Sequence, residues 1–260
     1  FSQSFGFHKL NRLDNALVRS TLSHAVSTWA REKISYQELL DLGVDANRIA
    51  LVPDAAFVLS KQKSDRVSKL LEKYSLSPQS FWVITVRQWS TYTSSFLDEV
   101  EVFINRALSA GLTQKIVLMA HTHGPSTGGD DRIPTQQLAQ RFSTQSNVVM
   151  LDDDLIPSEL VAFYGEAELM IGTRFHSVIF SLVGGTPAYA VSYAGPKTWG
   201  IMKMLEMENL CSDMKDFSSG KAIASIQAEN LLQVRAELPA KIKPLHQSLD
   251  DQFEQLQALV

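Results

Sequence analysis

A regular alternation of short apolar segments with longer amphipathic ones, beginning at Phe81, constrains the fold of this chain more than any other feature. Each apolar segment has the length of a buried strand, and the segment that follows it has helical spacing. Strands are expected at 81–89, 115–121, 147–151, 168–173 and 187–193, and helices at 93–111, near 135–143, from about 157, and at 175–185. This alternation predicts a parallel sheet covered by helices on both faces, as in doubly wound Rossmann-type domains.

The predicted sheet assigns residues 79–260 to a C-terminal Rossmann-like domain. Residues 1–78 also mix helix and strand patterns, and we expect them to be the C-terminal part of an N-terminal α/β domain. The chain starts without Met, in what reads as a strand and loop, which leaves open that an upstream segment of this domain is missing. The expected fold class is therefore α/β, with two Rossmann-like domains separated by a polar segment near residue 78.

Composition excludes several classes of protein. A chain of 260 residues with 45% hydrophobic residues can bury a sizeable core, and its net charge of −4 provides no basic field for nucleic acid. Cys211 is the only cysteine, so internal disulfides and cysteine-rich metal sites are excluded, and a reducing, cytoplasmic location is expected. No apolar run is long enough to span a bilayer, because Gly184, Gly185 and Pro187 interrupt the best candidate.

Basic and titratable side chains follow three of the predicted strands. Arg87 ends the first of these strands, His121 and His123 follow the second, and Arg174 and His176 follow the fourth. In open α/β sheets, ligands bind beyond the carboxyl ends of the strands, where helix N-termini and Arg side chains favour anions. The pattern therefore predicts a shared anion site, with surface ion pairs as the alternative for each Arg.

Three other motifs could be read as metal or nucleotide sites. His121 and His123 have the spacing of metal ligands, but the sequence places no carboxylate beside them. The run Asp152–Asp154 is most simply a solvated loop, with Mg²⁺ binding as the less favoured alternative. Gly128-Gly129 lacks the spacing of a dinucleotide motif or a P-loop. We therefore predict no metal site and no NAD or ATP site.

The segment from Ile171 to Lys197, IGTRFHSVIFSLVGGTPAYAVSYAGPK, resembles the C-terminal signature of polysaccharide pyruvyl transferases. That signature is a strand, Gly-x-Arg-Leu-His, a helix, Gly-x-Pro, a strand and Tyr-x-x-Lys. Phe175 stands where the family has Leu, and YAGPK contains one extra residue. Further segments resemble the family in the same order: SFGF at 4–7, AREKISYQEL at 30–39, LVPDAAF at 51–57 and VRQW at 86–89.

The resemblance implies an architecture like that of B-type glycosyltransferases, with the acceptor side in 1–78 and the phosphoenolpyruvate side in 79–260. Members of the family transfer the enolpyruvyl group of phosphoenolpyruvate to a sugar, forming a pyruvate ketal and releasing phosphate. Phosphoenolpyruvate would then be a cosubstrate, and no tightly bound cofactor is expected.

The resemblance also implies roles for individual residues. Because phosphoenolpyruvate carries a phosphate and a carboxylate, its site needs cationic anchors. The residues expected to bind it are Arg87, Arg174, Phe175, His176 and Lys197.

Two residues are expected to take part in catalysis, and three to line the substrate pocket. His176 is expected to serve as phosphate ligand or general acid. Asp54 could be the base for the acceptor hydroxyl, or it could cap the turn that follows it. His121, His123 and Tyr193 are expected in the substrate pocket.

Two other functions remain open at this point. A nucleotide-sugar-dependent glycosyltransferase or epimerase of the same architecture would bind diphosphate through Arg174 and His176, and a ribose through Glu206 or Glu208. The other alternative is a non-catalytic sugar-binding domain. The expected partners are phosphoenolpyruvate and a sugar or lipid-linked oligosaccharide acceptor, with no nucleic acid. Homo-oligomer formation and association with the inner face of the membrane through the substrate are left open.

Overall fold

The structure is a computed structural model that describes residues 3–5, 11–89, 93–124, 129–193 and 195–257. It divides into two compact units. The first unit contains residues 1–58, 194–208 and 240–260, and the second contains 59–193 and 209–239. Gly6 and Phe7 of the SFGF motif, Gly128 and Ala194 lie outside the described residues.

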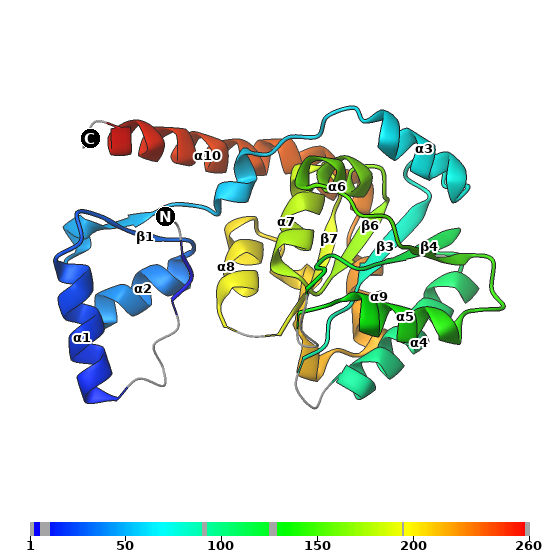
Figure 1. Cartoon of the computed structure of the whole chain (residues 1–260), viewed down its shortest axis with the longest axis horizontal. Helices are drawn as coiled ribbons and strands as arrows, with labels where there is room; N and C mark the ends of the chain where they lie inside the picture. The colour runs from blue at the N-terminus through cyan, green and yellow to red at the C-terminus, as the bar shows by residue number, and fades with distance from the viewer. Residues whose placement is uncertain (1–2, 6–10, 90–92, 125–128, 194, 258–260) are drawn as a thin grey trace. The chain divides into compact units, whose positions relative to one another are not determined.

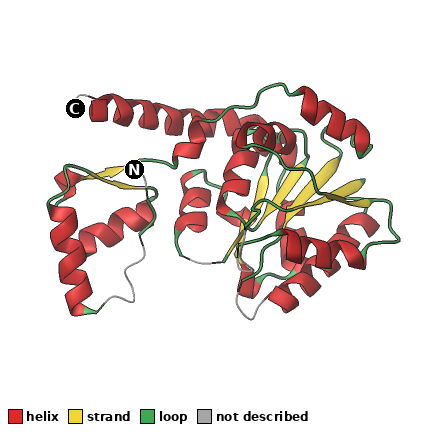
Figure 2. Cartoon of the chain, viewed as in Figure 1, coloured by secondary structure: helices red, strands yellow, loops and turns green. Residues whose placement is uncertain are grey.

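The second unit is built on a sheet of six parallel strands in the order β5-β4-β3-β6-β7-β8. The strands are β3 (Phe81–Thr85), β4 (Lys115–Met119), β5 (Val148–Leu151), β6 (Leu169–Gly172), β7 (Ala188–Ser192) and β8 (Cys211–Asp213). The first five confirm the predicted strands, and the sheet lies between layers of helices (Figure 2). The α/β fold with a parallel sheet is therefore confirmed.

Helices cover both faces of this sheet. They are α3 (Asp65–Lys73), α4 (Thr93–Ser109), α5 (Arg132–Arg141), α6 (Pro157–Tyr164), α7 (Phe175–Val183) and α9 (Ser219–Ala228). Helices α6 and α7 lie on one face with α3 beside α6, while α4, α5 and α9 lie on the other (Figure 1). All residues of β3, β6 and β7 are buried, which explains why their sequences are continuously apolar.

The strand order reverses between β3 and β6. Strand β3 pairs with β4 on one side and with β6 on the other, with Thr85 opposite Gly172 at the carboxyl end. The connections that leave β3 and β6 therefore diverge to opposite faces of the sheet, which opens a crevice at their carboxyl ends. Arg87 and Arg174 follow these two strands directly.

The first unit has a small core around the parallel strands β1 (Thr28–Ala30) and β2 (Ile49–Leu51). Ala30, Leu39, Val44 and Ile49 form this core. Its helices are α1 (Arg12–Ser23), α2 (Lys33–Asp41) and α8 (Lys197–Met204), and short 3₁₀ turns occur at Ala46–Arg48, Ala55–Val58 and Glu208–Leu210; a further one, Met214–Asp216, is in the second unit.

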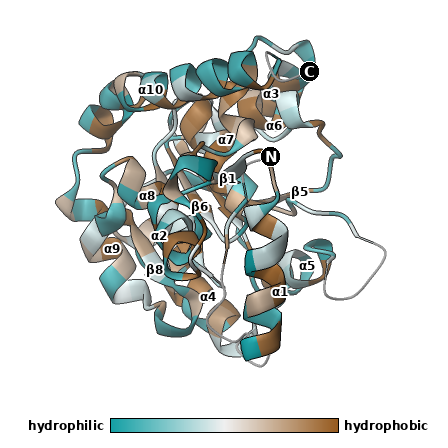
Figure 3. Cartoon of the chain, turned by 90° about the vertical axis from the view of Figure 1, so that its left-hand side faces the viewer, coloured by the Kyte–Doolittle hydropathy of each residue, from teal (hydrophilic) through white to brown (hydrophobic). Residues whose placement is uncertain are grey.

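Helix α10 (Leu231–Gln257) contributes to both units. Apolar and polar residues alternate along it (Figure 3), and its buried positions follow helical spacing: Leu238, Ile242, Leu245 and Leu249. No helix in the part of the chain that the structure describes is both long enough and apolar enough to cross a membrane.

The division into units differs from the predicted boundary after residue 78. Residues 59–78 belong to the second unit because α3 packs against α6, burying Val67 and Leu70. Segments 194–208 and 240–260 join the first unit instead of the second. There Trp29 meets Phe253 edge-on, with the ring centroids 6.0 Å apart. These contacts join segments that are distant in sequence, so local patterns could not indicate them.

Two glycines allow the ends of α6 and α7 to approach each other. A Cβ atom on Gly184 would lie 2.6 Å from the backbone oxygen of Val161 and 3.0 Å from the Cα of Gly165. Both neighbouring atoms are backbone atoms, which cannot move without shifting a helix.

We therefore expect Gly184→Ala to lower the free energy of unfolding by about 1–3 kcal/mol. Urea denaturation would measure this change. Gly220→Ala is the matched control, because a Cβ there meets only the flexible end of Arg106, at 3.2 Å. An unchanged midpoint for Gly184→Ala would mean that the two helices separate at little cost.

Candidate functional site

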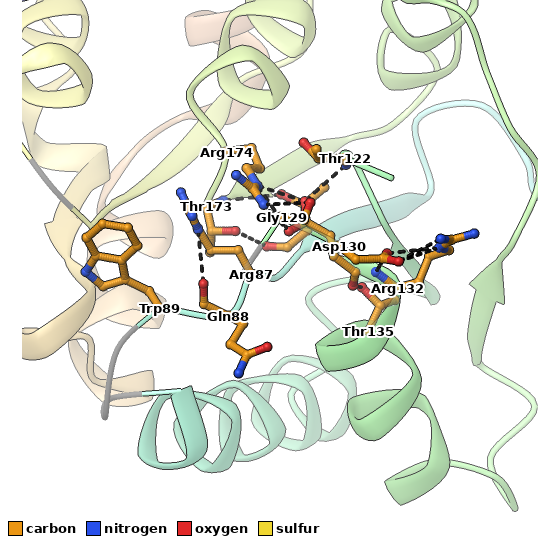
Figure 4. Close-up of polar contacts among 12 residues, drawn as sticks. Arg87, Gln88, Trp89, Thr122, Gly129, Asp130, Arg132, Thr135, Thr173 and Arg174 are labelled. Atoms are coloured by element: carbon orange, nitrogen blue, oxygen red, sulfur yellow. Dashed lines mark hydrogen bonds and ion pairs between the residues drawn. The ribbon is translucent and has the colours of Figure 1, made fainter. Parts of the chain in front are cut away.

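The candidate site lies at the carboxyl edge of the sheet in the second unit, where β3 and β6 end side by side. Thr173 links the two strand ends, because its N–H donates to Thr85 Oγ1 at 3.2 Å and its Oγ1 donates to the backbone oxygen of Thr85 at 3.0 Å. These buried bonds fix the positions from which Arg87 and Arg174 emerge (Figure 4).

Arg174 is held by a buried carboxylate, that of Asp131. The Arg174 Nε lies 3.0 and 2.9 Å from the two carboxylate oxygens, and Nη2 lies 2.6 Å from Oδ1. The Asp131 side chain is 0% exposed and that of Arg174 is 15% exposed. This is the two-pronged geometry that makes Arg–carboxylate pairs strong and directional, so the guanidinium has one orientation.

Asp131 is itself positioned by the connection from β4 to α5. Its N–H donates to the backbone oxygen of Thr122 at 2.9 Å, and the Thr122 N–H donates to Asp131 Oδ2 at 3.1 Å. Thr135 in the first turn of α5 donates its hydroxyl to the backbone oxygen of Asp131 at 2.6 Å. Burial raises the pKa of Asp131, whereas Arg174 and the Thr122 N–H act in the opposite direction.

Arg87 is held in a different way, by aromatic rings. Its guanidinium carbon lies 3.8 Å from the ring centroid of Tyr193 and 4.8 Å from that of Trp89. The residue is 5% exposed, and Nε reaches the backbone oxygen of Gln88 at 3.4 Å. No ion pair joins Arg87 to a carboxylate among the residues that the structure describes. Burial lowers the pKa of Arg87, and the nearby charge of Arg174 adds to this effect.

Phe175 and His176 form the first turn of α7. Arg174 is the N-cap residue of this helix and makes no capping bond through its side chain. Phe175 is buried, whereas His176 is exposed beside Phe175 and Phe180, with ring centroids 5.4 and 6.0 Å away. The helix therefore directs its positive end and an accessible imidazole toward the edge where Arg174 lies.

His121 follows β4 and packs against α6 and α7. Its Nδ1 lies 3.0 Å from the hydroxyl of Tyr164, and the two rings are stacked at 24° with their centroids 6.1 Å apart. Phe180 contacts the imidazole from α7, with ring centroids 5.6 Å apart. Burial lowers the pKa of His121 to about 3, helped by the nearby charges of His176, Arg174 and His123.

A cavity of about 380 Å³ opens beside His121, at the carboxyl ends of β4 and β5. His123 lines it and pairs through Nδ1 with Asp154. Asp153 also lines it and accepts bonds from Lys73 at 2.8 Å and from the Tyr74 hydroxyl at 2.9 Å. In the described ranges, no three His, Cys, Asp or Glu side chains are arranged to hold a metal ion.

The predicted site residues are thus distributed over two places in the second unit, and two of them belong to the first unit. Arg87, Arg174, Phe175, His176 and Tyr193 gather at the ends of β3, β6 and β7. His121 and His123 border the neighbouring cavity. Tyr193 does not line that cavity and stacks against Arg87, and its expected place in the substrate pocket stays a prediction.

Lys197 and Asp54 belong to the first unit. Lys197 begins α8, and its expected contact with phosphoenolpyruvate stays a prediction. Asp54 is 4% exposed, pairs with the Nε of Arg31 at 2.9 Å, and accepts the N–H of Ala56 at 2.9 Å. This is the capping role that the sequence left open, and the role of Asp54 as a base stays a prediction.

Sequence reasoning missed Asp131, Tyr164 and Trp89. Asp131 fell in the loop expected before the helix near 135–143, whereas it directly precedes α5, and nothing in the local sequence marks it as the partner of Arg174. Tyr164 lies in an apolar helix that reads as core, and Trp89 ends the predicted strand 81–89 but lies beyond β3, which ends at Thr85.

Comparisons with known proteins indicate the family and the fold of the chain. A sequence model of the polysaccharide pyruvyl transferase family matches residues 1–195. The amylovoran biosynthesis protein AmsJ of Erwinia amylovora is 25% identical over 220 residues, which are 82% of this chain and 53% of AmsJ. The chain therefore spans about half the length of that relative.

Solved structures of low sequence identity share the fold. The crystal structure of Anabaena Alr3699/HepE in complex with UDP and glucose has a TM-score of 0.61 and 13% identity, covering 99% of this chain and 70% of that one. UDP-GlcNAc 2-epimerase of Methanocaldococcus jannaschii, in complex with UDP-GlcNAc and UDP, has a TM-score of 0.59 and 15% identity, covering 87% of this chain and 59% of that one. This likeness confirms the predicted resemblance to the B-type glycosyltransferase architecture.

Asp131→Asn tests how the site is held together. The amide keeps the size of the side chain but leaves the Arg174 charge without its counter-ion, so we expect the free energy of unfolding to fall by about 3 kcal/mol. Asp130→Asn is the control, because Asp130 pairs with the exposed Arg132 and its loss should change stability little. Equal stability of the two variants in urea denaturation would contradict a structural role for the Asp131–Arg174 pair.

Proposed function

The chain belongs to the polysaccharide pyruvyl transferase family, and we propose that it transfers the enolpyruvyl group of phosphoenolpyruvate to a sugar of a polysaccharide or its precursor. The product is a pyruvate ketal, and inorganic phosphate is released. One observation carries the proposal beyond the family: the buried guanidinium of Arg87 packs against two adjacent aromatic rings, those of Tyr193 and Trp89, without a carboxylate partner among the described residues.

A buried cation without a counter-ion is costly unless a ligand supplies the negative charge. The contacts of Arg87 with Tyr193 and Trp89 offset part of this cost, by about 0.5–2 kcal/mol each. They also hold the flat guanidinium in place, so that less conformational freedom is lost when an anion binds. Arg87 is therefore prepared for an anionic ligand.

Phosphoenolpyruvate fits because it carries two anionic groups. Arg174 lies at the adjacent strand end, close enough for its charge to depress the pKa of Arg87. The N-terminus of α7 adds a partial positive charge at the same edge. Arg87 and Arg174 would bind the phosphate and the carboxylate, with Phe175 and His176 at the helix end beside them.

The reaction needs one proton donor and one hydroxyl pair. In the proposed step, the methylene carbon of phosphoenolpyruvate takes a proton, and one sugar hydroxyl attacks C2 and loses its own proton. Phosphate then leaves from C2 with the electron pair of its C–O bond, and a second hydroxyl of the sugar attacks C2, closes the ketal and gives its proton to the released phosphate. We assign the proton donor to His176, because its exposed imidazole lies next to Arg174 in the first turn of α7 and a histidine side chain can act as a general acid.

The remaining roles rest on the family resemblance. Lys197 would be a third cationic anchor, and Asp54 would receive the acceptor proton if it is released from its pairing with Arg31. The acceptor is a sugar or a lipid-linked oligosaccharide, and the reaction as proposed uses neither a metal nor a tightly bound cofactor.

Thermal unfolding in the presence of phosphoenolpyruvate tests the donor. Since a ligand that binds only the folded state raises the midpoint, we expect a rise of about 5–10 °C at 100 times Kd. Arg87→Ala and Arg174→Ala should each abolish most of the rise. Arg141→Ala is the matched control, because Arg141 forms surface pairs with Asp98 and Glu101.

Parallel titrations with UDP-sugars and inorganic phosphate separate the alternatives. A rise with UDP-sugars but none with phosphoenolpyruvate would replace our proposal with a nucleotide-sugar-dependent transferase or epimerase. An equal rise with phosphate alone would mean that the site recognises phosphate but not the enolpyruvyl group.

A further inference from the structure

His121 is a histidine that the proposed reaction does not use, although it lies beside the site. It follows β4, and contacts with two aromatic residues, Tyr164 and Phe180, determine its environment. The Tyr164 hydroxyl lies 3.0 Å from its Nδ1, the Tyr164 ring stacks on the imidazole, and Phe180 contacts it from α7. The ring is therefore fixed in orientation by α6 and α7, with its Nδ1 edge toward Tyr164.

The hydrogen bond with Tyr164 indicates which ring nitrogen carries the proton. Tyr164 is 0% exposed, and its burial raises its pKa, so the phenol keeps its proton. Among the described residues, Nδ1 of His121 is the hydrogen-bond partner of this hydroxyl, and no other acceptor reaches it. A buried O–H without an acceptor is unfavourable, so the phenol donates to Nδ1. Nδ1 is then the unprotonated nitrogen, and the proton of the neutral ring is on Nε2.

The charges around His121 keep the ring neutral. Arg174 at the end of β6, His176 in the first turn of α7 and His123 on the same loop all lie close enough to act on its charge. Each of these groups opposes a further positive charge, and burial acts in the same direction. Asp131, the buried carboxylate of the region, is engaged by Arg174.

We propose that Tyr164 fixes His121 as the neutral tautomer protonated on Nε2, and that this N–H donates a hydrogen bond to an oxygen of the substrate. His121 lines the cavity of about 380 Å³ at the carboxyl ends of β4 and β5, and no described group accepts a bond from Nε2. In this role His121 binds and orients the substrate but transfers no proton, which leaves His176 as the acid. The role toward substrate rests on the proposed function, whereas the tautomer does not.

The tautomer can be measured directly by ¹⁵N NMR of the imidazole nitrogens, with His121→Gln used to assign the signals. We expect Nδ1 to be unprotonated and Nε2 protonated, without change between about pH 5 and 8. Tyr164→Phe keeps the aromatic ring but removes the donor, so it should shift the Nδ1 signal and populate the other tautomer. Tyr189→Phe is the matched control, since Tyr189 is also buried but packs against Phe217. Its His121 signals should match those of the wild type.

Two outcomes would overturn the tautomer assignment. One is a proton on Nδ1 in the wild type, and the other is a His121 that titrates near its ordinary pKa of about 6.5. A wild-type spectrum that Tyr164→Phe leaves unchanged would remove Tyr164 as the residue that fixes the ring.

Pyruvyl transfer from phosphoenolpyruvate then tests the role toward substrate. The Gln side chain places an N–H donor near the position of Nε2, whereas Asn places one near Nδ1. We therefore expect His121→Gln to retain a kcat/KM about tenfold higher than His121→Asn, since one hydrogen bond is at stake. The plot of kcat/KM against pH should rise and fall at the same pH values in His121→Gln as in the wild type. An equal kcat/KM for the two variants, or a higher kcat/KM for His121→Asn, would overturn the donor role. If the wild type transfers no pyruvyl group, the proposed function fails, while the NMR result still decides the tautomer.

Discussion

The ion pair between Arg174 and Asp131 is the interaction on which the architecture of the site depends. It connects the end of β6 to the start of α5, and hydrogen bonds between Asp131 and Thr122 extend the connection to the loop after β4. Three segments at the carboxyl edge of one sheet are thus held by a single buried carboxylate. An Arg in this position without its partner would be free to adopt many rotamers and would orient no substrate.

The two arginines of the site are in opposite electrostatic situations. Arg174 is neutralised by Asp131, so it offers a ligand hydrogen-bond donors of fixed orientation more than it offers net charge. Arg87 has aromatic neighbours in place of a carboxylate, so its charge is available to a ligand. His121 adds a donor without adding charge. A site built in this way distinguishes a ligand by where its oxygens lie, and not only by its total charge.

Much of this arrangement follows from local sequence. Strands of a parallel sheet end at a common edge, so Arg87 and Arg174 could be predicted to meet from the strand pattern alone. Their partners could not, because Asp131 is 43 residues from Arg174 in the chain and reaches it only after α5 is packed. Tyr164 has the pattern of a core residue, and nothing in a helix periodicity distinguishes a buried ring from one that also donates a hydrogen bond. The three-residue β8, Cys-Ser-Asp, is too short and polar to be recognised without its neighbour β7.

The separation in sequence of Asp131 and Arg174 has a consequence for how such a site can diverge. If the carboxylate is lost, a buried cation remains without a counter-ion, and if the guanidinium is lost, a buried anion does. Either single change is therefore disfavoured. Natural variation at the two positions should therefore be coupled: relatives should keep both residues or replace both together. Covariation between positions 131 and 174 would then identify the relatives that have inherited this site geometry.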